Sequence, residues 1–311
     1  MGNFEEAGEL LANIHAHLTG QSADFLKGIT YTNSGFLQLN QGRGDLAEAS
    51  LQTALRHFES AGQNTGPHVA QSLSHLGLVY MSQGKYMQAQ EQLHRALSIR
   101  QKLVKNKDAL IAASYNDLGL AYSQTDKDLA LEFYEQAMKE YMILYGEHDP
   151  RIAIANINIG ILYRDLKLFG DAVNNFETAL KIWNNVYPQP HPAKAIALYN
   201  LGQTYLQLND RQAARAFYDK ALTMYRDCYG SQHPEIASVL NAIGNLQVAE
   251  SRFDESLQSY QHALHANVQN FKEDHAQVNP SLENYYNGTR LLHTLLFKAQ
   301  KLLRGFSDGM Q

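Results

Sequence analysis

Apolar residues recur along most of the chain at spacings of three and four, and short polar segments separate the runs that they form. This spacing is typical of amphipathic α-helices, which place one apolar face against a neighbour. The separating segments carry helix-breaking residues, as in "SQGKY", "LKLFG", "QLNDR" and "AESRF". The pattern therefore predicts an all-α protein built from helix pairs that are joined by short turns.

A glycine that follows an apolar residue recurs at intervals of 41 or 42 residues. A small residue stands about twelve positions after each glycine, and an alanine stands seven positions beyond that. The glycines are Gly35, Gly77, Gly119, Gly160, Gly202 and Gly244; the small residues are Ala47, Ala89, Ala130, Ala172, Ala214 and Ser256; the alanines are Ala54, Ala96, Ala137, Ala179, Ala221 and Ala263. Small residues allow two helices to approach closely. Since one pair cannot bury its apolar face alone, neighbouring pairs are expected to stack.

These landmarks, with a tyrosine three positions after four of the glycines, resemble the tetratricopeptide repeat in the long form found in kinesin light chains and many bacterial proteins. The resemblance covers residues 24–270 as six units and implies a right-handed superhelical solenoid of antiparallel helix pairs. Residues 1–23 are expected to hold an N-terminal capping helix over 4–18, which also fits the second helix of a truncated repeat. Residues 271–311 are expected to form a linker and a C-terminal capping helix or helix pair.

The C-terminal sequence "SLENYY…LLHTLLFKAQKLL" has a second, shorter resemblance. It is similar to the segment that joins repeats to a caspase-like CHAT peptidase in some bacterial proteins. This resemblance implies that the chain is the regulatory or sensor arm of a peptidase whose catalytic domain is not in this sequence.

Composition and charge exclude several classes of function. The chain has 26 basic and 31 acidic residues, so it lacks the excess of positive charge that is typical of a nucleic-acid-binding protein. One cysteine excludes an intramolecular disulfide framework and a cysteine-based zinc site, and it fits a reducing compartment. The sequence has no secretory signal pattern and no apolar stretch long enough for a membrane span. We therefore expect a cytoplasmic protein with no cofactor, no metal, no nucleic-acid partner and no membrane partner.

Histidine–proline and aspartate–proline pairs recur in "YGEHDPRIA", "YPQPHPAKA" and "YGSQHPEIA", each between two repeats. Proline costs no hydrogen bond in the first turn of a helix, so Asp149, His191 and His233 are expected at or near an N-cap. Cys228 near His233 suggests a nucleophile pair as an alternative, but no third orienting group and no oxyanion donor accompanies them. No enzyme motif occurs, and we predict no catalytic residue and no enzyme activity.

In this family, the first helix of each repeat lines a concave face. The position two residues before the repeat glycine holds Asn33, His75, Asp117, Asn158, Asn200 and Ala242. An asparagine amide both donates and accepts, so it can pair with a peptide's C=O and N–H groups together. The alternative interpretation is that these asparagines make polar contacts between helices of the protein itself.

Other positions on the same face are expected to determine specificity. The complete predicted partner-binding set is Asn33, Asn116, Asp117, Asn158, Ile161, Arg164, Tyr199, Asn200, Gln203 and Asn241. The apolar residues among these equally fit a continuation of the core. Tetratricopeptide proteins that clamp a terminal carboxylate use a lysine six residues before the glycine. No lysine stands at that position here, which argues against such a clamp.

These observations predict a scaffold that binds a peptide or a partner segment on its concave face. Three alternatives remain open: the sensor arm of a CHAT-type peptidase, a module that self-associates into a homo-oligomer through its end helices, and a cysteine-dependent enzyme.

Overall fold

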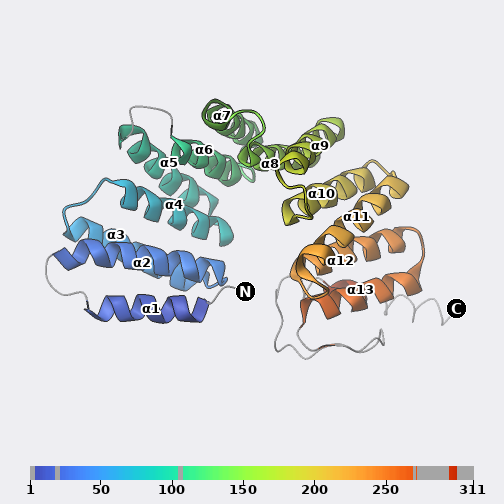
Figure 1. Ribbon diagram of the computed structural model, residues 1–311, viewed down its shortest axis with the longest axis horizontal. Coiled ribbons are helices and arrows are strands. Elements are labelled where there is room, and N and C mark those ends of the chain that lie inside the picture. Colours follow the sequence, from blue (N-terminus) through green and yellow to red (C-terminus); the bar gives the residue numbers. More distant parts are fainter. Residues whose placement is uncertain (1–3, 18–21, 104–107, 269–270, 272–293, 300–311) are drawn as a thin grey trace. The chain divides into compact units, whose positions relative to one another are not determined.

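The computed structural model describes residues 4–17, 22–103, 108–268, 271 and 294–299. The labelled helices in chain order are α1 Phe4–His17, α2 Ser22–Asn40, α3 Gly44–Ser60, α4 Pro67–Ser82, α5 Tyr86–Leu103, α6 Ala109–Tyr122, α7 Lys127–Tyr145, α8 Pro150–Asp165, α9 Phe169–Val186, α10 Pro192–Gln207, α11 Arg211–Tyr229, α12 Pro234–Ala249 and α13 Phe253–Asn267 (Figure 1). The predicted all-α fold class is confirmed. The helix predicted over residues 4–18 is also present, as α1.

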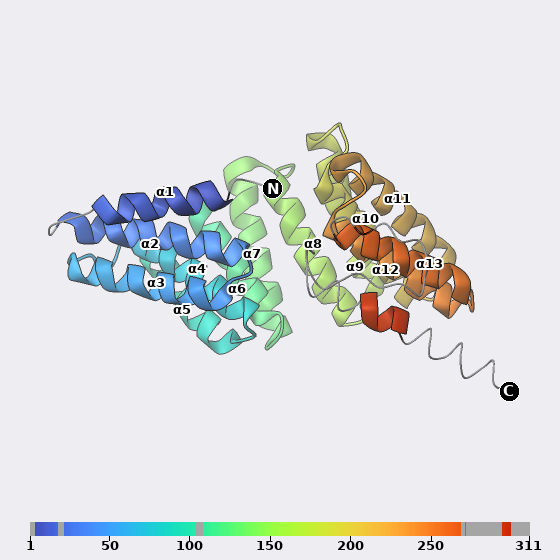
Figure 2. The same cartoon turned by 90° about the horizontal axis from the view of Figure 1, so that it is seen from below.

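The helices after α1 form hairpins that pair α2 with α3, α4 with α5, and so on to α12 with α13 (Figure 1). The chain divides into two compact units, residues 1–158 and residues 159–311. In the second unit, the helices from α9 to α13 each pack against the next one in the chain (Figure 2). The boundaries at residues 23 and 270 that the sequence suggested remain predictions.

The repeat glycine is required by the close packing of the two helices in each pair. A Cβ atom on Gly202 in α10 would lie 2.6 Å from the ring of Tyr218 in α11. A Cβ on Gly77 would lie 2.7 Å from the side chain of Leu93, and one on Gly160 would lie 2.6 Å from the ring of Phe176. Packed carbon atoms stay about 3.5–4.0 Å apart, so any larger residue at this position would force the helices apart.

The small-residue landmarks form the centre of the core. Ala47, Ala89, Ala130, Ala172, Ala214 and Ser256 are fully buried, and so are Ala54, Ala96, Ala137, Ala179, Ala221 and Ala263. Large side chains from the second helix of each pair, such as Tyr134, Phe176 and Tyr218, fill the space over the glycines. The sequence landmarks therefore mark the contact surfaces inside each pair.

Most turns within the helix pairs contain one residue with a left-handed backbone. It is a glycine in the first two repeats, at Gly42 and Gly84, whereas Lys167, Asn209 and Ser251 hold the same position later, with φ of 61–62°. The third repeat has no positive-φ residue in its turn. There the Asp126 N–H bonds to Tyr122 O at 2.8 Å, and Asp126 directly caps α7. The missing residue explains why this repeat has 41 residues and not 42.

Helix starts between the repeats are capped by the residue before the proline. The Asp149 carboxylate accepts from the Arg151 N–H at 2.9 Å. The Nδ1 atoms of His191 and His233 accept from the N–H two residues later, both at 3.2 Å. These contacts confirm the predicted N-cap role.

A tyrosine supports each of these helix starts. The ring centroid of Tyr187 lies 3.8 Å from that of His191, and the centroid of Tyr229 lies 3.7 Å from that of His233, both stacked. At the equivalent place Arg151 lies 3.6 Å over the ring of Tyr145. His191 and His233 are therefore part of the helix-start structure.

After the last repeat, the structure describes residue 271 and the C-terminal segment 294–299, which is helical. Its Phe297 ring stacks 5.9 Å from Tyr260, and the Lys298 ammonium donates to Gln261 Oε1 at 2.5 Å, so the segment packs on α13. The rest of the linker and of the capping helix or helix pair predicted over residues 271–311 lies outside the described residues.

Candidate functional site

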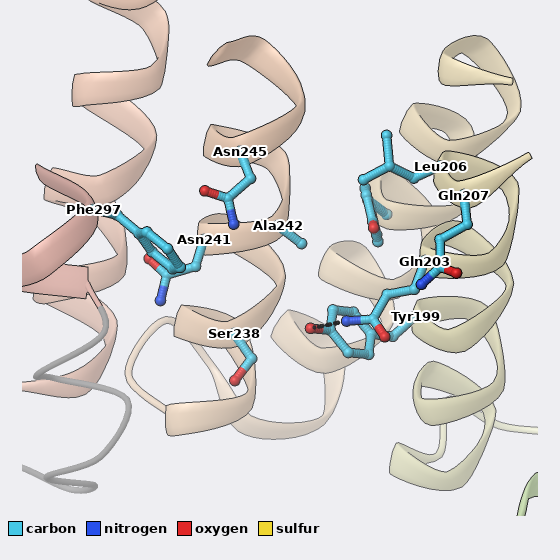
Figure 3. Close-up of a pocket in the computed structure, with 10 residues that line it drawn as sticks. Tyr199, Gln203, Leu206, Gln207, Ser238, Asn241, Ala242, Asn245 and Phe297 are labelled. Atoms are coloured by element: carbon cyan, nitrogen blue, oxygen red, sulfur yellow. Dashed lines mark hydrogen bonds between the residues drawn. The ribbon is translucent and has the colours of Figure 1, made fainter. Parts of the chain in front are cut away.

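A groove of about 380 Å³ lies between α10 and α12 in the second unit (Figure 3). α10 contributes Tyr199, Gln203 and Leu206, and α12 contributes Ser238, Asn241 and Asn245. Tyr218 from α11 and Phe297 from the C-terminal segment add aromatic surface. None of the described side chains that line the groove carries a charge. The groove therefore offers amide and hydroxyl groups beside apolar surface.

Hydrogen bonds fix several of the lining side chains. Gln203 Nε2 donates to Tyr199 Oη at 2.6 Å across one turn of α10 (Figure 3). Tyr260 Oη donates to Asn245 Oδ1 at 2.7 Å. Because these contacts hold the side chains in place, little conformational entropy would be lost when a ligand binds.

Asn241 combines burial with an unsatisfied acceptor. Its side chain is 7 % exposed, and its Nδ2 donates to Thr294 Oγ1 at 2.8 Å. Its Oδ1 is buried and has no hydrogen-bond partner among the described residues. A buried amide oxygen without a donor costs on the order of 1–3 kcal/mol, so a peptide N–H that reached it after a small shift would recover that energy.

Arg164 on α8 and Asn200 on α10 form a second polar centre in the second unit. Arg164 Nη1 on α8 donates to Asn200 Oδ1 at 2.8 Å, and Asn200 Nδ2 donates to Ile196 O at 2.9 Å. Burial lowers the pKa of Arg164, while the nearby charge of Asp165 opposes this. Arg164 nevertheless forms no ion pair with any carboxylate of the described residues.

The first unit holds the other predicted polar residues in a separate set of contacts. Asn158 Nδ2 donates to Asn116 Oδ1 at 3.0 Å, which joins two repeats. Burial raises the pKa of the Asp117 carboxyl to about 6, although Arg100 acts in the opposite direction. Asn33 is exposed on α2. Asn116, Asp117, Asn158 and Asn33 therefore belong to the first unit, whereas the α10–α12 groove belongs to the second.

His75 occupies the asparagine position of the second repeat. Burial lowers its pKa to about 4, with a smaller contribution from the charge of Arg100. Its ring stacks 4.6 Å from that of Phe36, and its Nδ1 is buried without a hydrogen-bond partner among the described residues. The side chain is therefore neutral at physiological pH.

Of the residues expected to bind a partner, Tyr199, Gln203 and Asn241 line the groove. Asn200 directly follows Tyr199 in α10 and accepts a hydrogen bond from Arg164, but neither residue lines the groove. Ile161 is half-buried on α8, one turn before Arg164. Tyr218 and Phe297 were not in the predicted set. Tyr218 could have been found, because aromatic residues recur at that position in Tyr134, Phe176, Tyr218 and Tyr260.

Cys228 and His233, the two residues considered for catalysis, lie in surroundings that do not favour it. Burial raises the pKa of the Cys228 thiol, with a smaller effect from Asp227, so little thiolate forms at neutral pH. His233 uses its Nδ1 as a helix cap. Within the described part of the chain, no group of three or more His, Cys, Asp or Glu side chains could hold a metal ion. None of the helices described here is long and apolar enough to cross a membrane.

Several solved structures share this fold. NprR in complex with its cognate peptide NprX is 15 % identical, with a TM-score of 0.64, over 96 % of this chain and 78 % of that one. Rap protein complexed with competence and sporulation factor is 13 % identical, with a TM-score of 0.63, over 84 % and 69 % of the two chains. A putative kinesin light chain with TPR-like repeats from Podosopora anserina is 18 % identical, with a TM-score of 0.54, over 63 % and 93 %.

At these identities the similarity concerns the fold alone. A comparison with curated protein sequences found no match. The family model of the tetratricopeptide repeat matches residues 68–139, 151–227 and 212–266, which together make up more than half of the chain. The helix pairs, the repeat glycines and this match lead to one conclusion: the chain belongs to the tetratricopeptide repeat family.

Proposed function

We propose that this protein is an interaction module that binds an extended peptide or partner segment in the groove between α10 and α12, and that it catalyses no reaction. The observation that carries the proposal is Asn241, whose buried Oδ1 lacks a donor at the edge of a groove lined by amides, hydroxyls and aromatic rings. A peptide backbone supplies donors and acceptors in alternation, and its side chains would use the apolar part of the groove.

Two structural neighbours support the proposal. NprR was solved with its cognate peptide, and Rap protein was solved with competence and sporulation factor. The fold shared with these proteins is compatible with peptide binding on the faces that the first helices of the pairs present.

A selection experiment tests the proposal. A display library of random 12-residue peptides is selected against the full chain, and the dissociation constants of the enriched peptides are measured by fluorescence anisotropy. We expect Gln203→Ala combined with Asn245→Ala to weaken binding by about tenfold or more, because each amide removed eliminates hydrogen bonds to the ligand.

The matched control is Asn184→Ala, an exposed asparagine on α9, which should leave the affinity unchanged. Circular dichroism melts verify that all variants are folded. If the enriched peptides bind the double variant as tightly as the unmodified chain, the groove is not the site.

A further inference from the structure

We propose that Arg164 binds the carboxylate of an acidic side chain in the peptide, so that the ligand of this protein is an acidic peptide. This inference rests on the proposed function and deepens it, because it assigns the ligand's chemistry. Asn200, the acceptor of the Arg164 hydrogen bond, directly follows the groove residue Tyr199 in α10.

The first argument is the way the guanidinium is held. Asn200 is 6 % exposed, and its Nδ2 bonds to the Ile196 carbonyl, which directs its Oδ1 at Arg164. An arginine has five N–H donors, and the contact with Asn200 uses one of them. The group is therefore positioned in advance, with donors left for a carboxylate, which arginine binds through two parallel hydrogen bonds.

The second argument is electrostatic. Arg164 is half-buried and forms no ion pair with a carboxylate of the described residues. Asp165 is exposed on the same helix and does not neutralise it through a direct contact. Because the groove lining itself is uncharged, Arg164 supplies the positive potential that an acidic ligand would meet there.

The third argument is that the groove and the Arg164–Asn200 pair are close enough for one peptide to contact both. Tyr199 and Tyr218 both line the groove, with their ring centroids 5.9 Å apart, and Tyr199 directly precedes Asn200, which accepts from Arg164. Packed helices lie about 8–10 Å apart, and an extended chain advances about 3.3 Å per residue. The acidic residue should therefore stand roughly three positions from the side chain that occupies the groove.

The geometry favours an internal acidic residue over a terminal carboxylate. Ile161 is half-buried one turn before Arg164 on α8, so apolar surface continues past the guanidinium. A peptide that continues along this surface would reach Arg164 with a side chain and would not end there.

The test uses the peptides selected above, each in three synthetic forms: the original, one with the acidic residue changed to its amide (Glu→Gln or Asp→Asn), and one with an amidated C terminus. We expect Asp or Glu to be enriched about three positions from an aromatic or aliphatic residue. The amide form should bind the unmodified protein about tenfold more weakly, and Arg164→Gln should weaken only the acidic form. Amidating the C terminus should have no effect.

Two controls keep the outcomes distinct. Asp165→Asn should leave binding of the acidic peptide equal or slightly stronger, because it removes a neighbouring negative charge. If Arg164→Gln does not fold, the loss on changing the peptide's acidic residue to its amide still tests the inference on the unmodified protein.

Three results would separate the two proposals. Peptides that need Gln203 and Asn245 but show no preference for acids overturn this inference and leave the proposed function intact. A loss on C-terminal amidation, without a loss in the internal amide form, shows that the carboxylate is terminal and contradicts the geometry argued here. If Gln203→Ala combined with Asn245→Ala leaves the dissociation constant of the peptides unchanged, the proposed function itself is overturned.

Discussion

Single residues determine how closely the helices of each pair approach. At Gly202 the missing Cβ makes room for the Tyr218 ring, and the same arrangement recurs with Leu93 over Gly77 and Phe176 over Gly160. Such a contact is sensitive to one added carbon, because the partner is a large side chain that is itself buried in the core. The glycine is therefore a packing requirement, although its backbone is ordinary helix.

Gly202→Ala should lower the free energy of unfolding by about 2 kcal/mol or more, because the new Cβ would overlap the Tyr218 ring. The matched control is Gly170→Ala on α9, where an added Cβ meets no atom within 4 Å. Alanine has the higher helix propensity, so this control should stabilise the protein by about 0.5 kcal/mol. Urea unfolding measures the free energy of unfolding of the two variants, and an equal change in both would contradict the packing argument.

Three turn residues hold a left-handed backbone at the cost of a Cβ clash. Lys167→Gly and Ser251→Gly should each raise the free energy of unfolding by about 0.5–1 kcal/mol, since glycine adopts positive φ without strain. Asn209→Gly should gain less, because asparagine tolerates this conformation better than most residues. Thermal melts compare each variant with the unmodified chain. If Lys167→Gly and Ser251→Gly both lose stability, the lysine and serine side chains stabilise the turns by more than the strain of positive φ costs.

At the scale of the element, the helix starts depend on a cap and a supporting ring. His233→Ala should lower the free energy of unfolding by about 1–2 kcal/mol, because it removes the N-cap acceptor and the ring stacked on Tyr229. His148→Ala is the control: this histidine is exposed, and Asp149 caps the helix that follows it. Its stability should change by less than about 0.5 kcal/mol. Similar losses in the two variants would contradict the capping role.

The helices and their caps could be predicted from the sequence because each depends on residues close in the chain. The glycine spacing, the buried alanines and the proline after each cap all repeat with the period. Positions on the first helix of each pair likewise indicated Tyr199 and Gln203. The contacts of Arg164 with Asn200 and of Asn158 with Asn116 cross between repeats, so they depend on rotamers that a repeat pattern does not specify. Phe297 could not be placed because it comes from outside the repeats.

At the scale of the molecule, the first unit contains two groups whose titrations oppose each other. The folded state lowers the pKa of His75 to about 4, so stability is lost as the pH falls below the ordinary histidine value of 6.5. It raises the pKa of Asp117 to about 6, so stability is lost as the pH rises above the ordinary value of 3.8. Between pH 4 and 6 the two slopes have opposite signs and partly cancel.

Removing either group should expose the slope of the other. In His75→Gln the free energy of unfolding should fall by about 1–2 kcal/mol as the pH rises from 4 to 6, and in Asp117→Asn it should rise by a similar amount. The free energy of unfolding of both variants is measured by urea unfolding at several pH values in this range. The difference between the two variants is then plotted against pH, because the contribution of the other carboxylates is the same in both and drops out. Parallel curves would mean that neither group is perturbed by the fold.

The pairing of each repeat glycine with a large side chain has a consequence for how such a chain can grow. Both partners lie in the same helix pair, about sixteen residues apart, and Pro150, Pro192 and Pro234 start successive first helices at intervals of 42. A duplication that begins at one proline and ends before the next copies the matched partners together, with the cap that starts the following helix. Recombination inside a pair would instead join a glycine to an unmatched partner, so lengthening by whole repeats preserves the core.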